Sequence, residues 1–182
     1  TAVGYSREHT FSHSWMPTFP ADGNPAKPEY SDQHNLYPVN QNQANSPRSN
    51  LPMNVITGNV VFTYLDGKAG YNGSQLVYEP RNEQKGNAAR AMFYMATAYN
   101  GISGTNWQLP TNQDQQILKT WHDTDEPDNY EIARNEYIFS QQGNRNPYVD
   151  SVQFACYVNF SNMTYESTGC GGLGINEQLL QQ

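Results

Sequence analysis

Apolar residues are sparse in the first part of this chain. Residues 1–57 are rich in Pro, Asn and Ser, a composition that predicts mostly loops with short strands and at most one short helix. We expect residues 3–11 to be extended. Such a strand would place Glu8 and His9 near its end.

Two prolines should bound the one helix of this region. Pro38 can occupy the first position of a helix, and Pro47 should end it, because the residue before a proline avoids the α region. The prolines therefore predict a short helix with Asn45 in its last turn.

The hydrophobic pattern becomes regular after residue 55. Residues 60–65 and 75–79 are expected to form strands, separated by a Gly-rich turn that contains Asp66-Gly67 and Asn72-Gly73. Residues 88–99, which follow Asn87, are apolar almost all round, as in a buried central helix, and Asn100-Gly101 would end that helix.

Two further helices are expected toward the C-terminus. Thr111 and Asp114 resemble a capping box in front of residues 117–121. Pro127 suits the first position of the next helix. One face of that helix would carry Tyr130, Ala133, Tyr137 and Ile138. Strands and helices of this kind predict a single α+β domain over residues 1–182.

Composition narrows the class of protein. Hydrophobic residues make up 36% of the chain and aromatic residues 13%, including 13 Tyr, so the core must use aromatic side chains whose polar tips need partners. No run approaches the ~20 apolar residues of a membrane span, and we expect no membrane association.

The charge balance argues against a nucleic-acid partner when it is taken alone. The net charge is −7 and Lys plus Arg total 10, whereas contacts of these cations with phosphates dominate nucleic-acid affinity. The carboxylates, however, gather at residues 123–128, away from the polar N-terminal segments that hold Arg7 and Arg48. A bound divalent cation would add positive charge. The acidic balance therefore does not exclude such a partner.

The chain contains two cysteines, Cys156 and Cys170. They are either unrelated thiols or, in an exported protein, a single disulfide that closes a modest loop, and we expect the disulfide. No CxxC or His-rich ligand spacing is present, which argues against a structural zinc site.

The candidate chemistry lies in two polar clusters, one around Glu8 and His9 and one between Asp32 and Asn50. His9 is the best candidate for a general base, because a neutral imidazole can take a proton from water that attacks phosphorus. Its alternative is a hydrogen-bonded structural histidine. Glu8 is a hard oxygen donor suited to Mg²⁺ or Ca²⁺, and Asn45 could add a neutral carbonyl oxygen. A structural role is expected for the other histidines, His13, His34 and His122.

Two arginines need separate interpretations. Arg48 follows Asn45 by three positions, near a helix end, where a guanidinium can reach a phosphate bidentately; its alternative is a solvated surface arginine. Arg90 lies in an apolar helix, where an unpaired charge would be costly. It either pairs with a carboxylate such as Glu79 or points toward a site. The polar stretch 142–147 is expected as a turn, with amide donors lining a nucleic-acid groove as its functional interpretation.

Taken together, these segments resemble the bacterial endonuclease I family, which consists of secreted or periplasmic nucleases whose active site is a ββα-metal (His-Me) finger. The resemblance runs from Tyr5 to about Cys156. Its motifs are Arg7-Glu8-His9, residues 34–38 and 45–50, Glu79-Pro80, Lys85-Gly86, Ala89-Arg90, Tyr94-Met95, Trp121-His122, Glu131 and residues 142–149. Family members generally carry sequence before the Arg-Glu-His motif, so the resemblance implies that the domain lacks an N-terminal segment.

The resemblance implies roles for the matching residues. His9 would be the general base, and Glu8 and Asn45 would be ligands of a divalent metal, usually Mg²⁺, with Ca²⁺ or Mn²⁺ as alternatives. Asn40 and Asn42 stay open as replacements for Asn45, since the chain has one residue more than some members between the two motifs. The phosphate would be neutralised by Arg48 or Arg90. Substrate contacts are expected from Arg7, Asn35, Asn50, Asn144 and Arg145.

The leading hypothesis is a secreted or periplasmic, metal-dependent endonuclease without an obligate protein partner. It would hydrolyse DNA, with RNA as a second substrate, and would show little sequence preference because its contacts go mainly to the backbone. The alternative is a non-catalytic extracellular carbohydrate-binding module, favoured by the acidic charge and by the Trp, Tyr and Asn content.

Overall fold

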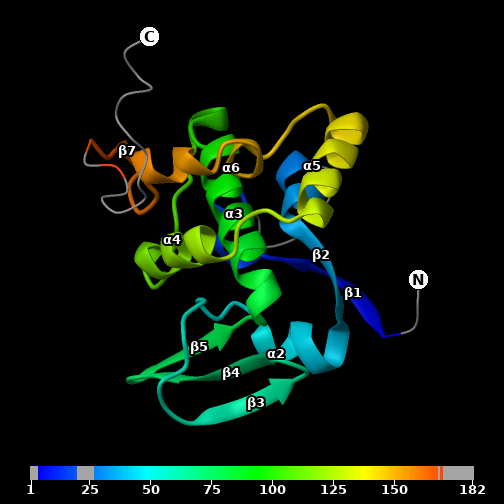
Figure 1. The fold of residues 1–182 in the computed structure, drawn as a ribbon, viewed down its shortest axis with the longest axis vertical. Helices are drawn as coiled ribbons and strands as arrows, with labels where there is room; N and C mark the ends of the chain where they lie inside the picture. Colours follow the sequence, from blue (N-terminus) through cyan, green and yellow to red (C-terminus); the bar gives the residue numbers. More distant parts are fainter. Residues whose placement is uncertain (1–3, 20–26, 168, 170–182) are drawn as a thin grey trace.

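A long helix, α3 (Asn82–Ala98), lies at the centre of the molecule, with the other helices around it (Figure 1). The computed structural model describes residues 4–19, 27–167 and 169. The remaining α-helices are α1 (Pro28–Ser31), α2 (Ser46–Arg48), α4 (Gln115–Thr124), α5 (Asn129–Gln142) and α6 (Pro147–Asp150). Shorter helical turns are η1 (His13–Trp15), η2 (Gln33–Asn35), the π-helical η3 (Gln41–Asn45), η4 (Ile102–Gly104) and η5 (Val152–Tyr157).

The described strands form small antiparallel sheets. The pairs are β1 (Tyr5–His9) with β2 (Leu36–Asn40), and β6 (Val158–Asn159) with β7 (Thr164–Tyr165); the larger sheet has the order β3 (Val60–Tyr64), β4 (Gly67–Asn72), β5 (Gln75–Glu79). In Figure 1 this larger sheet lies beyond one end of α3, next to α2. The combination of separate helices and small sheets agrees with the predicted α+β class.

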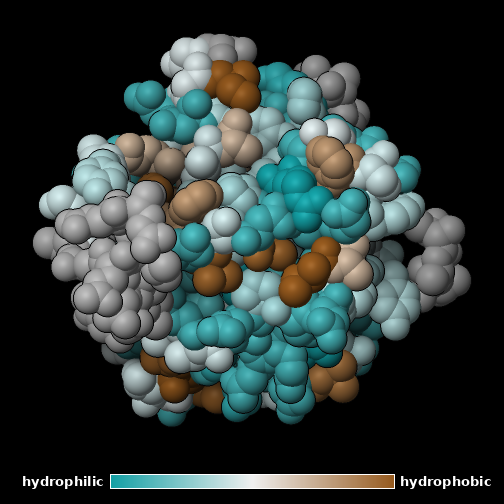
Figure 2. Space-filling view, turned by 45° about the horizontal axis from the view of Figure 1, so that its top comes forward, coloured by the Kyte–Doolittle hydropathy of each residue, from teal (hydrophilic) through white to brown (hydrophobic). Residues whose placement is uncertain are grey.

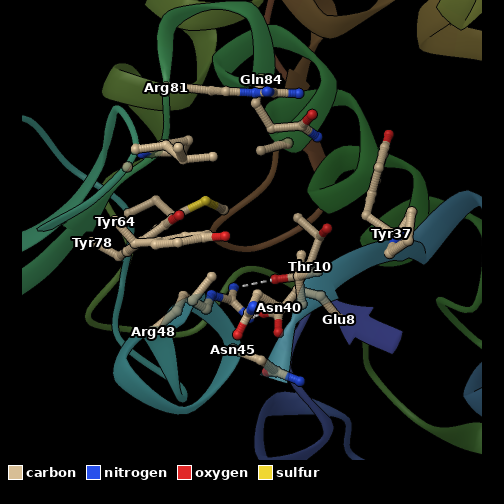
Figure 3. A pocket seen from close by; sticks show the side chains of 18 of the residues that line it. Glu8, Thr10, Tyr37, Asn40, Asn45, Arg48, Tyr64, Tyr78, Arg81 and Gln84 are labelled. Carbon is tan, nitrogen blue, oxygen red and sulfur yellow. Dashed lines mark hydrogen bonds and ion pairs between the residues drawn. The ribbon is translucent and has the colours of Figure 1, made fainter. Parts of the chain in front are cut away.

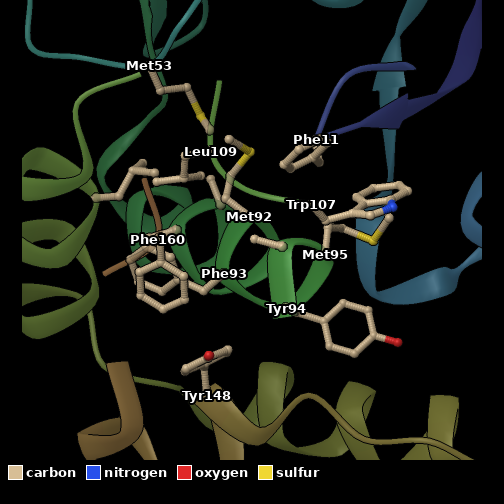
Figure 4. Packing of buried hydrophobic residues seen from close by; sticks show 14 of the residues in the cluster. Phe11, Met53, Met92, Phe93, Tyr94, Met95, Trp107, Leu109, Tyr148 and Phe160 are labelled. Carbon is tan, nitrogen blue, oxygen red and sulfur yellow. The ribbon is translucent and has the colours of Figure 1, made fainter. Parts of the chain in front are cut away.

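From Gly86 to Ala96, helix α3 is buried on all sides, as the apolar pattern of its sequence predicts for most of this stretch. Met92, Phe93 and Met95 have no exposed surface, and Tyr94 is 2% exposed. They pack against aromatic and aliphatic side chains from other parts of the chain (Figure 4). The helix ends as expected, because Gly101 adopts a left-handed conformation with φ of 80°. It begins earlier than expected, however, so that Asn87 lies inside it rather than before it.

The polar tips of the core tyrosines have partners, as the composition requires. Tyr94 and Tyr99 both donate to Oδ2 of the buried Asp32, at 2.6 and 2.7 Å. The Tyr148 hydroxyl lies 2.7 Å from Oγ1 of Thr97. Burial, followed by the charge of Asp32, raises the pKa of both Tyr94 and Tyr99, so both stay neutral donors.

The Gly-rich turn predicted between two strands is wrong, because residues 67–72 form the middle strand β4. Its glycines serve close packing as well as turns. A Cβ on Gly70 would lie 2.7 Å from the Asn59 carbonyl oxygen, so only glycine fits there. The two turn signals therefore flank a short strand that the sequence alone does not separate from them.

The helix predicted between Pro38 and Pro47 is displaced. Pro38 lies in β2 opposite Arg7, and the helical turns begin only after Asn40, whose Oδ1 accepts from the backbone N–H groups of residues 42 and 43. Pro47 lies near the start of α2, where its missing N–H costs no hydrogen bond. Asn45 is consequently in the middle of the helical segment rather than in its last turn.

The two C-terminal helices also differ from expectation. Asp114 caps α4 by accepting from Gln116 N, without a reciprocal partner at Thr111, and Asp128 rather than Pro127 precedes α5. The apolar face expected in α5 is confirmed at Ile138, which is buried, and is wrong at Tyr130, Ala133 and Tyr137, which are exposed. The buried residues of α5 are Glu131, Asn135 and Ile138, whereas Tyr130 and Tyr137 are each 66% exposed. This helix turns polar groups inward because a buried arginine, described below, needs a partner.

The predicted disulfide involves a residue that the structure does not describe. Cys156 is buried, but Cys170 lies outside the described residues, so the disulfide stays a prediction.

Of the helices in the described part of the chain, none combines the length and apolar character that a bilayer-spanning segment needs. On the face shown in Figure 2, hydrophobic residues are scattered in small groups among hydrophilic ones.

Candidate active site

The β1–β2 pair and the helical turns that follow it bring the two polar clusters together. The antiparallel register sets Glu8 opposite Tyr37 and His9 opposite Leu36, and the chain then passes directly into η3 and α2. A cavity of about 1020 Å³ lies at this junction. Among the residues predicted to form the site, those that line it are Arg7, Glu8, His9, Asn45, Arg48 and Asn50.

His9 is held in one tautomer. Its Nε2 lies 2.9 Å from the backbone carbonyl oxygen of Tyr30. Because a carbonyl can only accept, Nε2 carries the proton and Nδ1 keeps its lone pair. Burial, together with the nearby positive charges of Arg7 and Arg48, lowers the pKa of His9 to about 4. The imidazole is therefore neutral near pH 7 and able to accept a proton at Nδ1.

His13 belongs to the same site, although the sequence suggests a structural role for it. Its Nε2 lies 2.8 Å from Nε2 of His9, and the ring centroids are 3.7 Å apart. In a continuous strand, residues four apart would be separated by roughly 13 Å. The chain instead turns after β1 into η1. The signal that could have found this pair is the turn-forming Ser12 between two histidines, which is weak on its own.

Arg48 holds Glu8 in place. Its guanidinium forms a short ion pair with Oε1 of Glu8 and donates to the backbone carbonyls of His9, at 2.8 Å, and Thr10, at 2.5 Å. Arg48 is 5% exposed, so the alternative of a solvated surface arginine is wrong. Burial raises the pKa of Glu8, and Arg48 opposes that shift. The other carboxylate oxygen, Oε2, makes no hydrogen bond within the described residues.

Asn45 presents a carbonyl oxygen beside this carboxylate. Its Nδ2 donates to Ser6 Oγ at 2.7 Å and to Gln41 Oε1 at 3.5 Å, and its Oδ1 has no partner in the described part of the chain. Figure 3 shows Glu8, Asn45 and Arg48 together at one side of a second cavity. The alternative ligand Asn40 uses its Oδ1 to cap η3.

Glu8 and Asn45 offer two hard oxygen atoms, which suits a cation that keeps most of its water, as Mg²⁺ does. Within residues 4–19 and 27–167, no three His, Cys, Asp or Glu side chains come close enough to form a metal site. The pair of oxygen donors, Glu8 and Asn45, therefore fits a sparsely ligated hard cation.

Arg90 lines neither this cavity nor the one shown in Figure 3. It has no exposed surface, and its guanidinium pairs with the carboxylate of Glu131 through Nε, at 2.9 and 2.8 Å, and through Nη2, at 2.5 Å. It also donates to the Asp125 carbonyl oxygen at 2.8 Å. The predicted partner Glu79 is wrong, since Glu79 pairs with Lys85. A buried guanidinium satisfied in this way stabilises the fold and cannot reach a substrate, so the catalytic assignment of Arg90 is corrected.

Three predicted substrate contacts also lie outside the cavity. Asn35 is fully buried, and its side-chain amide bonds both the N–H and the C=O of Phe11, which fixes the segment after β1. Asn144 donates to the Tyr94 hydroxyl at 2.5 Å. Arg145 is engaged by Asp150 and Glu136, which raise its pKa. These side chains support the structure around the site rather than line it.

Known nucleases are similar to this chain in sequence. A family model described as Endonuclease I matches residues 1–153. The extracellular ribonuclease of Bacillus subtilis (strain 168) is 32% identical over 162 residues, which cover 83% of this chain and 52% of that protein. Endonuclease-1 of Buchnera aphidicola subsp. Baizongia pistaciae (strain Bp) is 31% identical over 126 residues, or 66% and 46% of the two chains. The chain thus spans about half the length of these relatives. None of these matches supports the alternative of a carbohydrate-binding module.

Proposed function

The chain belongs to the endonuclease I family, and we propose that it is a metal-dependent endonuclease. It would hydrolyse internal phosphodiester bonds of DNA and, as a second substrate, RNA, with little sequence preference. The observation that carries this proposal is a neutral His9 with an available Nδ1, in the same cavity as the oxygen donors Glu8 and Asn45.

His9 would act as the general base. Its Nδ1 would accept a proton from the water that attacks phosphorus, while the bond from Nε2 to the Tyr30 carbonyl keeps the ring oriented. A pKa of about 4 makes His9 a weak base in the free protein. A phosphodiester in the cavity would bring negative charge close to the ring and favour its protonation, whereas the divalent cation would oppose it.

Glu8 and Asn45 would hold the divalent cation, which membership in this family favours in general. When bound, such an ion stabilises the developing charge on phosphorus and on the leaving oxygen. We propose Mg²⁺, with Ca²⁺ or Mn²⁺ as alternatives, because both donors are hard oxygen atoms and few in number.

We assign different roles to Arg48 and Arg7. Arg48 is committed to Glu8 and to backbone carbonyls, so we assign it to positioning the metal-binding carboxylate. Arg7 is exposed and lines the larger cavity, and its side chain makes no hydrogen bond or ion pair with any described residue. It is therefore the cation available to contact a phosphate.

The order strand, strand, helix supports a ββα-metal (His-Me) finger. β1 carries the proposed base, β2 pairs with β1, and the helical segment from Gln41 to Arg48 carries the second metal ligand. The name of the Bacillus relative, an extracellular ribonuclease, supports export from the cell as well as activity on RNA.

The test uses supercoiled plasmid DNA and a folded RNA as parallel substrates. The chain is first stripped of metal with a chelator and then assayed with and without added Mg²⁺. We expect nicking of the plasmid and fragmentation of the RNA only after Mg²⁺ is added. Equal cutting in excess chelator would contradict the role of the metal, and no cutting of either substrate would contradict the nuclease assignment.

A further inference from the structure

A second cavity, of about 430 Å³, lies next to the proposed metal ligands. It shares Glu8, Asn45 and Arg48 with the larger cavity, so the two meet at these residues. Its outer wall comes from the β3–β4 turn, from β5 and from the segment before α3. Figure 3 shows Tyr64 and Tyr78 on one side of this cavity and Arg81 above them.

Leu65 is unusual in backbone and in exposure. It lies in the tight turn between β3 and β4, where Tyr64 pairs with Gly67, and it has a positive φ of 51°. Glycine is the ordinary residue at such a turn position, and a bulky side chain there is strained. Leu65 is nevertheless 71% exposed and lines the cavity. Strained residues of this kind cluster at functional sites, which makes Leu65 a candidate for contact with a ligand.

Tyr64 and Tyr78 supply aromatic surface beside this leucine. Both are partly exposed and line the cavity. Gly67 makes room for the second ring, because a Cβ at Gly67 would lie 2.7 Å from the Tyr78 hydroxyl oxygen. Burial raises the pKa of Tyr78, with smaller opposing contributions from Arg48 and Arg81. The Tyr78 side chain therefore stays neutral, and its ring offers an apolar surface near the charged groups of Arg48, Glu8 and Arg81.

Arg81 is one of the few uncommitted cations of the molecule. All 10 Lys and Arg side chains fall within the described residues. Of these, the ones without a hydrogen bond, an ion pair or an aromatic contact to any described residue are Arg7, Lys68 and Arg81. Arg7 lines the larger cavity and Arg81 the smaller one. Each of the two cavities that share Glu8 therefore contains one cation that is free to contact a phosphate.

We propose that the smaller cavity binds one unstacked base of a single-stranded nucleic acid, next to the bond that is cut. Tyr64 and Leu65 contact the base, and Arg81 contacts the adjacent phosphate. A base in a duplex must first leave its stack, which costs free energy, so the site favours unpaired strands. This inference rests on the proposed function, because it takes a nucleic-acid strand as the ligand.

Binding measured in excess chelator tests the site without turnover. Two fluorescein-labelled probes are compared by anisotropy: a thymidine oligonucleotide of about 12 residues and the same backbone without bases. We expect the chain to bind the thymidine probe roughly tenfold more tightly, since stacking of bases on aromatic rings is sequence-tolerant and strong. Tyr64→Ala should remove most of this preference. Tyr137→Ala, a more exposed tyrosine of α5 outside both cavities, should keep it.

The arginine and the leucine have matched tests of their own. Arg81→Gln should weaken binding of both probes by the same factor, because both retain phosphates, whereas Lys68→Gln should leave binding unchanged. Leu65→Gly relieves the strained φ, so the variant should melt at the same temperature or higher and still lose affinity for the thymidine probe. That combination separates a role in binding from a role in folding.

Equal affinity of the unaltered chain for the two probes would overturn the proposal, as would equal losses in Tyr64→Ala and Tyr137→Ala. The result is independent of cleavage. A chain that binds bases but cuts nothing would contradict the proposed nuclease function and leave the base site standing. A chain that cuts nucleic acid but does not prefer the thymidine probe would contradict the base site and leave the proposed nuclease function standing.

Discussion

His9 and His13 face each other through their Nε2 atoms, 2.8 Å apart, at the end of β1. Because Nε2 of His9 also lies 2.9 Å from the Tyr30 carbonyl oxygen, its proton is shared between two acceptors, and Nε2 of His13 is one of them. His13 is thus a positioning residue: it helps to fix the ring whose other nitrogen is the proposed base.

Replacing His13 should reduce activity modestly. In His13→Ala the His9 ring keeps the Tyr30 carbonyl but loses one acceptor, and a net loss of about 1 kcal/mol corresponds to roughly fivefold in kcat. His13→Gln retains an acceptor oxygen and should recover part of the rate. Steady-state cleavage of an oligonucleotide would measure kcat and KM for each variant. A loss in His13→Ala as large as that in His9→Ala would make His13 the base instead.

Removing one oxygen donor should weaken metal binding specifically. In Asn45→Ala the cavity keeps Glu8 but loses the amide oxygen, so the Mg²⁺ concentration for half-maximal activity should rise by roughly tenfold or more. Asn50→Ala is the matched control. Asn50 lines the larger cavity, as Asn45 does, but it does not line the smaller cavity to which both Glu8 and Asn45 belong. An unchanged Mg²⁺ requirement in Asn45→Ala would remove this residue from the metal site.

The Arg90–Glu131 pair should matter for stability and not for chemistry. Glu131→Gln leaves a buried guanidinium without its counter-charge, at a cost of about 3–5 kcal/mol in the free energy of unfolding. Glu136→Gln breaks an exposed pair with Arg145 and should cost much less, because solvent screens that pair. Urea unfolding measures both. The rate per folded Glu131→Gln molecule should match the unaltered chain, and a specific loss of that rate would return Arg90 to the active site.

His122 should contribute to a loss of stability in mild acid, alongside His9, His13 and His34, whose pKa values are also lowered. Burial lowers the pKa of His122 from 6.5 to about 4, and its Nδ1 is buried without a hydrogen-bond partner in the described residues. In the unfolded chain the ring protonates near 6.5, so the folded state is fully favoured above that pH and loses stability as the pH falls toward 4. Urea midpoints above pH 6.5 and at about pH 5 should show this loss, and His122→Gln should reduce it. A slope that is unchanged in this variant would assign the effect to other groups.

The sequence predicts the elements whose residues carry a local signal. The strand that ends at His9, the apolar helix α3 and its glycine stop all follow from local patterning. The family motifs likewise predict that Glu8, His9 and Asn45 belong to one site, and the structure brings all three to one cavity.

What the sequence misses depends on partners that are distant along the chain. The inward face of α5 is polar because Glu131 forms an ion pair with Arg90, 41 positions away along the chain. Asn35 resembles a surface amide, yet it is fully buried because it bonds the backbone of Phe11 across the site. His13 reaches His9 only because the chain turns after β1. None of these contacts has a periodic signature, so each becomes visible only with the fold.

The most direct measurement is the initial rate of plasmid nicking at neutral pH with Mg²⁺ for the unaltered chain and for His9→Ala, each checked for an intact fold by its melting temperature. Because removal of a general base typically costs roughly 10²–10⁴ in rate, the account predicts a loss of that size with the fold retained. Nicking by His9→Ala at the rate of the unaltered chain would contradict it.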